Sequence, residues 1–126
     1  MKPYRIATLL IVLSSCTAHR DQFFYQKTVD FVYHTNDSKS FCEALSKDVS
    51  PIDKILDEST YLKLYAAGEE NNEDVQTITV SINTQIFRFK ALRKLGSISD
   101  TYCQEKIKNV NDMARILRDA EGVKKL

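Results

Sequence analysis

Three cysteines, Cys16, Cys42 and Cys103, carry the most distinctive chemistry in this chain of 126 residues. A thiol can form a disulfide, bind a metal ion or be modified covalently. Zinc sites use cysteines at close spacing together with clustered histidines. Here Cys42 and Cys103 are sixty-one positions apart, and His19 and His34 stand apart from both. The sequence therefore predicts no metal site, and it predicts that both histidines are exposed on the surface.

No motif of a catalytic site is present in the sequence. Nothing in it matches a glycine-rich phosphate loop, a metalloprotease helix or a nucleophile elbow, and it contains only 3 glycines. Its neighbouring acidic pairs, Asp57-Glu58, Glu69-Glu70 and Glu73-Asp74, are interpreted as solvated charges, because a glycosidase needs two carboxyl groups that converge across a cleft. We therefore predict that the protein is not an enzyme and uses no cofactor.

One basic cluster is a candidate binding surface, and it consists of Arg88, Lys90, Arg93 and Lys94. Such a cluster can contact an acidic partner or anionic lipid headgroups. It can also be a solvated face that stabilises the C-terminus of a helix. We expect these four residues to contact a partner.

The chain as a whole is nearly neutral, with a formal net charge of +1 at pH 7. Loss of residues 1–15 would remove Lys2 and Arg5 and would leave all 17 acidic residues in place. Nucleic-acid binding requires a clear basic excess on one face of the protein. The sequence therefore predicts no nucleic-acid partner.

The N-terminus has the order of an export signal. Lys2 and Arg5 supply positive charge, and the uncharged apolar run over residues 6–13 is too short to span a bilayer as a helix. The run ends in Leu13-Ser14-Ser15-Cys16, which resembles the lipobox of bacterial lipoproteins over residues 1–17. Two other interpretations stay open. One is an ordinary cleaved signal followed by a chance cysteine, and the other is a buried N-terminal strand of a cytosolic protein.

The lipobox resemblance implies a lipid-anchored protein. In that family the cysteine is lipidated on its sulfur and becomes the mature N-terminus after cleavage by the lipoprotein signal peptidase. For this chain it implies a signal peptide over residues 1–15, lipid on Cys16, a tether over 16–20 and a domain over 21–126. An Asp after the cysteine retains family members in the inner membrane, and here that position is Thr17. The implied location is the outer membrane, with the domain facing the periplasm.

The same resemblance bears on the other two cysteines. Once Cys16 carries lipid, Cys42 and Cys103 are the thiols that remain. An exported chain reaches an oxidising compartment, where free thiols pair. We therefore expect a Cys42–Cys103 disulfide.

Apolar spacing predicts five helices joined by short loops. Four are substantial, at about 20–35, 50–67, 75–95 and from 97 or 99 to 122, and a short one covers about 39–47. Ser50 followed by Pro51 is typical of a helix start, and Gly68 stands where a left-handed C-terminal cap is expected. The predicted fold is all-α, a compact antiparallel bundle of four main helices plus one short helix, pinned by one disulfide.

Residues 75–95 allow two interpretations. With a period of two, apolar and polar residues alternate, so 76–90 could form a β-hairpin and the fold would be α+β. With a helical period, one stripe contains Val75, Ile78, Ile82, Ile86, Phe89, Leu92 and Leu95, and only Val80 and Phe87 lie off it. The ends favour a helix, because acidic residues stand at its start and Arg93-Lys94 precedes Gly96 at its end.

A tethered helical domain without a catalytic motif suits a protein that docks another protein at a membrane. In size and organisation it is similar to small helical pilotins, which escort secretin subunits to the outer membrane, and to immunity and surface-exclusion lipoproteins. We expect a non-enzymatic lipoprotein that binds a protein partner in a groove, with the basic cluster near or beside it. The alternatives are a structural envelope lipoprotein, and a peptidoglycan-binding module or envelope enzyme with ionisable groups converging in a deep pocket.

Overall fold

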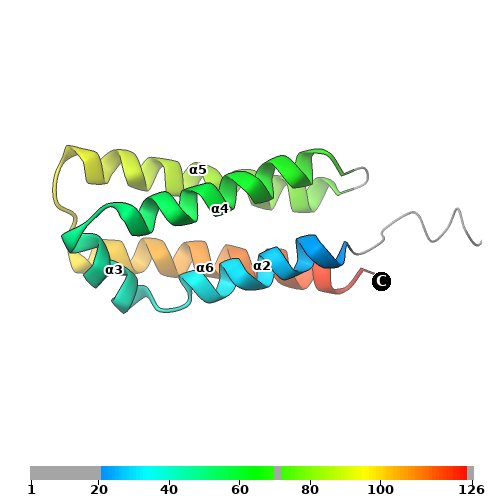
Figure 1. Ribbon diagram of the computed structural model, residues 1–126, viewed down its shortest axis with the longest axis horizontal. Helices are drawn as coiled ribbons and strands as arrows, with labels where there is room; N and C mark the ends of the chain where they lie inside the picture. The colour runs from blue at the N-terminus through cyan, green and yellow to red at the C-terminus, as the bar shows by residue number, and fades with distance from the viewer. Residues whose placement is uncertain (1–20, 70–71, 125–126) are drawn as a thin grey trace, which may run out of the picture.

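The computed structural model describes residues 21–69 and 72–124, which form five helices (Figure 1). These are α2 (Gln22–Thr35), α3 (Ser38–Lys47), α4 (Ser50–Ala67), α5 (Glu73–Leu95) and α6 (Asp100–Gly122). The described residues contain no β-strand, so the all-α prediction is confirmed and the alternative hairpin at 76–90 is wrong. The predicted signal peptide, the lipid site at Cys16 and the tether lie outside the described residues.

The four long helices form an antiparallel bundle in up-down-up-down order. α4 packs against α5, α5 against α6, α6 against α2, and α2 against α4, so α2 and α5 are diagonally opposite (Figure 1). The short α3 lies at one end of the bundle, where it packs against α6 and α4. α2 begins and α6 ends at the other end, so the predicted tether would join the bundle at the end away from α3.

The core contains one apolar face from each helix, and α5 shows how the sequence selects it. Buried positions of α5 are Val75, Thr79, Ile82, Ile86 and Phe89, while Val80 and Phe87 are exposed as predicted. The inclusion of Leu92 and Leu95 in the buried stripe is wrong, because both are exposed. Leu92 and Leu95 lie three and six residues after Phe89. At 3.6 residues per turn, each step of three residues turns the side chain by about 60° around the helix axis, away from the core face.

Two predicted helix ends differ from the structure. Ser50 does not cap α4 but lies in its first turn, and Asp48 accepts a hydrogen bond from the Ser50 N–H at 3.3 Å. The hydrogen bonds that Ser50 donates lower the pKa of the Asp48 carboxyl group. Gly68 has a φ of −84°, which is right-handed, because its N–H donates to the Tyr65 carbonyl at 3.1 Å and tightens the last turn.

The sulfur atoms of Cys42 and Cys103 lie at bonding distance, as the sequence predicts. Their Cα atoms are 6.0 Å apart, within the range of about 4.4–6.8 Å for disulfides. Both cysteines are buried, one in α3 and the other in the first turn of α6. The bond therefore holds the short helix onto the bundle.

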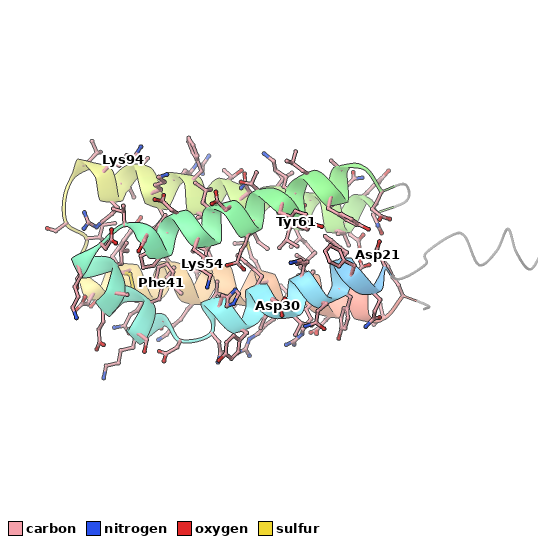
Figure 2. The ribbon with its side chains drawn as sticks, viewed as in Figure 1. Asp21, Asp30, Phe41, Lys54, Tyr61 and Lys94 are labelled. Atoms are coloured by element: carbon pink, nitrogen blue, oxygen red, sulfur yellow. A yellow bond between two sulfur atoms is a disulfide. The ribbon has the colours of Figure 1, made fainter. Side chains whose placement is uncertain are left out.

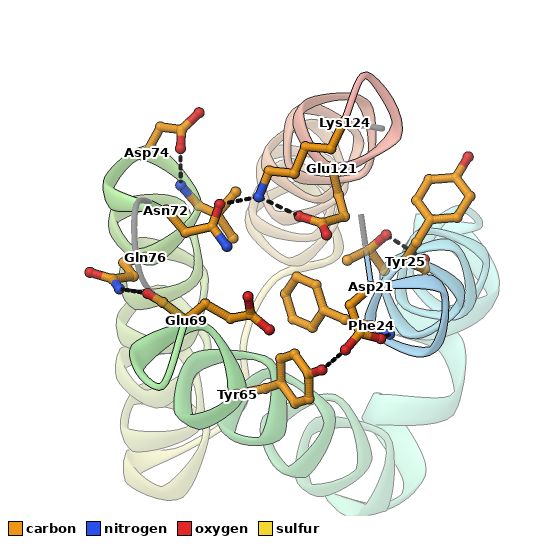
Figure 3. Close-up of polar contacts among 12 residues, drawn as sticks. Asp21, Phe24, Tyr25, Tyr65, Glu69, Asn72, Asp74, Gln76, Glu121 and Lys124 are labelled. Carbon is orange, nitrogen blue, oxygen red and sulfur yellow. Dashed lines mark hydrogen bonds and ion pairs between the residues drawn. The ribbon is translucent and has the colours of Figure 1, made fainter. Parts of the chain in front are cut away.

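Polar contacts close the end of the bundle at which α2 begins (Figure 3). Lys124 forms an ion pair with Glu121 at 2.9 Å and also donates to the side chain of Asn72. Glu121 is only 2% exposed, and a buried carboxylate is costly without a charged partner. Across the same end, the Tyr65 hydroxyl donates to the carboxylate of Asp21. These contacts attach the first and last described turns to the rest of the bundle.

Candidate partner-binding groove

A groove of about 480 Å³ lies between α2 and α4. α2 follows the predicted tether in the chain, and α4 follows α3. The polar and aromatic lining of the groove is Phe23, Lys27, Asp30 and His34 from α2 with Lys54, Asp57, Glu58 and Tyr61 from α4. On α2 these positions are three or four apart, and on α4 the same spacing holds for Lys54, Glu58 and Tyr61, with Asp57 next to Glu58. One side of each helix therefore forms one wall. Asp30, Lys54 and Tyr61 lie along the space between the two helices in Figure 2. The groove therefore runs along both helices.

One end of the groove is aromatic. Phe23 is 58% exposed and Tyr61 is 40% exposed, and their ring centroids are 6.4 Å apart with the planes at 78°. The ammonium group of Lys27 lies 5.2 Å from the Phe23 centroid and 6.0 Å from the Tyr61 centroid. These distances are in the range of cation–π attraction. Two solvent-exposed rings held at fixed angles offer an apolar surface that another molecule can cover.

The centre of the groove is polar. His34 Nδ1 and Glu58 Oε2 are 2.7 Å apart, and both side chains are partly buried. The other carboxylate oxygen, Glu58 Oε1, is buried and has no hydrogen-bond partner among the described residues. Buried polar atoms are nearly always satisfied, so an unpaired oxygen needs an explanation. Because this oxygen is buried, the carboxylate that a bound molecule can reach in this part of the groove is the exposed Asp57.

A second hollow of about 540 Å³ continues the groove, because His34 and Lys54 line both. It lies between the end of α2, α3 and the start of α4, and Tyr33, Phe41 and Pro51 contribute its apolar lining. Together the two hollows follow α4 from Pro51 to Tyr61, a length of about 15 Å at a rise of about 1.5 Å per residue. That length accommodates about three turns of a bound helix.

Asp37 lines the second hollow and is the N-cap residue of α3. Asp37 accepts hydrogen bonds from the backbone N–H and the hydroxyl of Ser40, at 3.0 and 2.8 Å. The backbone hydrogen bond and then the hydroxyl lower the pKa of Asp37. Because the folded-state pKa is depressed, this contact stabilises the fold above the unfolded pKa and is lost as the pH falls through the folded one.

None of the four residues of the predicted basic cluster lines the groove. Lys90 forms an ion pair with Asp53 of α4 at 2.7 Å, and Arg93 donates to the Leu45 carbonyl at 3.4 Å. Arg88 and Lys94 are exposed on the outer side of α5, and Figure 2 labels Lys94 there. The four side chains therefore do not share one face. Their role in partner binding stays a prediction, and only Arg88 and Lys94 point outward.

Sequence reasoning missed the pairing of His34 with Glu58. His34 was expected to be a simple surface residue and Glu58 a solvated charge, but the two are 24 positions apart and meet across the groove. Only the spacing of Lys54, Asp57, Glu58 and Tyr61 on one side of α4 could have indicated a polar wall there.

The lining of the groove combines ionisable and aromatic side chains. The His34–Glu58 pair can accept a proton or orient a polar group of a ligand. Phe23, Tyr61 and Leu62 add apolar surface beside that pair. Among residues 21–69 and 72–124, no three potential ligand side chains are grouped to hold a metal ion.

Within residues 21–69 and 72–124, no helix is both long and apolar enough to cross a bilayer.

Comparisons of the chain with protein-family models, with curated proteins and with solved structures found no match.

Proposed function

We propose that the chain is a lipid-anchored protein of the bacterial outer membrane that binds a protein partner in the α2/α4 groove and catalyses no reaction. The observation that carries the proposal is the exposed aromatic pair, Phe23 and Tyr61, at the edge of a groove between two helices. Aromatic side chains dominate the binding energy of many protein interfaces. The lipid anchor rests on the lipobox-like Leu13-Ser14-Ser15-Cys16.

The partner element that fits this groove is an amphipathic helix. Such a helix binds through apolar side chains at spacings of three and four residues, and the groove offers apolar surface at both ends. Phe23 and Tyr61 stand at one end, with Phe41 and Pro51 at the other. A lysine or arginine near the middle of the partner helix would pair with the exposed carboxylate of Asp57. Among pilotins, immunity lipoproteins and surface-exclusion lipoproteins, a groove that binds a helix favours a pilotin-like role.

The position of the groove is compatible with the anchor. Phe23 lies in the first turn of α2, two residues after Asp21, at which the described chain begins. The aromatic end of the groove is therefore the end nearest the proposed tether. A partner helix bound there would lie close to the membrane surface.

The double substitution Phe23→Ala/Tyr61→Ala is expected to lower partner capture by tenfold or more, on the order of the effect of losing an aromatic hot spot. The measurement is quantitative mass spectrometry of proteins that co-purify with the lipidated protein from envelope membranes. Ile116→Ala is the matched control, because Ile116 is also 58% exposed but lies on α6. The partner is the protein that the double variant loses and the control retains. Identical sets of co-purifying proteins for all three forms would contradict the proposal.

A second candidate function is peptidoglycan binding or an envelope enzyme activity, and the His34–Glu58 pair favours it. Ionisable groups that converge in a pocket are typical of ligand and active sites. Sedimentation with purified peptidoglycan distinguishes the two functions. Binding that is lost in both His34→Gln and Glu58→Gln but kept in Phe23→Ala/Tyr61→Ala would favour this candidate.

A further inference from the structure

α5 carries an outward-facing stripe on the side opposite its buried face. The outer stripe consists of Glu73, Thr77, Val80, Thr84, Phe87, Ala91 and Lys94, at spacings of three and four residues. Phe87 is 64% exposed and Val80 is 49% exposed. α4 and α6 pack against the other sides of α5, and no element among the described residues covers the outer stripe.

The two halves of the outer stripe differ in charge and in size. Its first half contains the acidic Glu73 with Thr77 and Val80, while its second half contains the bulky Phe87, the small Ala91 and the basic Lys94. Neither Glu73 nor Lys94 forms an ion pair within residues 21–69 and 72–124. The stripe is therefore complementary to its own reverse, because reversing it places Lys94 beside Glu73 and Phe87 beside the smaller Val80.

We propose that a second copy of this chain packs on the outer stripe, with the two α5 helices antiparallel about a two-fold axis between Asn83 and Thr84. Such a pairing brings Lys94 of one copy beside Glu73 of the other, and by symmetry it does so twice. Phe87 then packs beside Val80 and Ser81 of the second copy, and Ala91 faces Thr77. A parallel pairing would instead set Lys94 against Lys94, which is repulsive.

The dimer is compatible with two lipid anchors in one membrane. A two-fold axis perpendicular to both α5 helices relates the two bundles, so the starts of the two α2 helices lie at the same height along that axis. With the axis perpendicular to the bilayer, both anchors reach the same surface. The proposal does not depend on the proposed groove function, because the α2/α4 groove is not part of the outer stripe.

Charge exchange tests this pairing in the full-length lipidated protein in detergent micelles, with sedimentation equilibrium as the measurement. The wild type is expected to dimerise. Lys94→Glu and Glu73→Lys are each expected to raise the dissociation constant by about tenfold, because each turns two attractive pairs into repulsive ones. The double variant Glu73→Lys/Lys94→Glu restores both pairs, so its dissociation constant is expected to return to within about twofold of the wild-type value. Lys108→Glu and Glu105→Lys, at exposed positions of α6, are the matched controls and are expected to change nothing.

A second readout locates the axis. In envelope membranes under oxidising conditions, Thr84→Cys is expected to give a covalent dimer, whereas Lys108→Cys is expected to stay monomeric. The pairing is overturned if the wild type is monomeric up to about 100 μM, a concentration above the dissociation constants of most specific interfaces. A dimer that tolerates both single reversals, or a double variant that dimerises no better than the single ones, would also overturn it.

Discussion

Reduction of the Cys42–Cys103 bond is expected to lower the free energy of unfolding by about 4 kcal/mol. The bond joins residues 61 positions apart, and closing a loop of that length in the unfolded chain accounts for this value in the chain-entropy model. A domain of this size has a total stability of about 5–15 kcal/mol, so the loss is a large share of it. The melting temperature should fall by roughly 15 °C, given a shift of about 4 °C per kcal/mol.

Thermal unfolding followed by circular dichroism, with and without a reductant, measures this effect. The variant Cys42→Ala/Cys103→Ala is the control, since its melting temperature should be low in both conditions and insensitive to the reductant. A fall of less than a few degrees in the wild type would contradict the expected loop-closure effect. Two reactive thiols in the denatured, unreduced protein from the envelope would contradict the bond itself.

Replacement of Cys16 by Ser is expected to remove the protein from the outer-membrane fraction and to block its processing. The lipobox resemblance assigns the lipid to the sulfur of Cys16, and serine has no sulfur to accept it. Stable anchoring requires more than one acyl chain, so no weaker attachment can replace the lipidated residue. Membrane fractionation with immunoblotting measures both the location and the size of the chain.

Cys42→Ser is the matched control for this experiment, because it also removes a thiol but leaves the lipobox-like sequence intact. It should reach the outer membrane in processed form, although with lowered stability. Equal membrane retention and equal mass for the wild type and Cys16→Ser would contradict the lipid anchor.

The fold could be predicted from the sequence largely because the helical pattern of α5 was correctly weighed against a strand pattern. Thr77 and Thr79 contribute to the strand signal, yet each satisfies its hydroxyl inside the helix. Thr77 donates to the Glu73 carbonyl at 2.8 Å, and Thr79 donates to the Gln76 carbonyl at 2.9 Å. Such back-bonding makes threonine compatible with a helix, and the buried face then decides the structure.

The groove could not be predicted in the same way. Its polar centre depends on how α2 packs against α4, and local sequence does not determine which residues 24 positions apart will meet. In contrast, the sequence positions alone could have shown that the side chains of the basic cluster point to different sides of α5. Lys90 is two positions from Arg88, and residues two apart on a helix point to different sides, so a single basic face was never available.

Mass spectrometry of the N-terminal peptide of the protein isolated from outer membranes tests the proposed anchor most directly. The expected peptide begins at Cys16 and carries the added mass of acyl chains. A peptide that begins upstream of Cys16, or one with an unmodified Cys16 thiol, would contradict the proposal that this bundle is a lipid-anchored protein of the envelope.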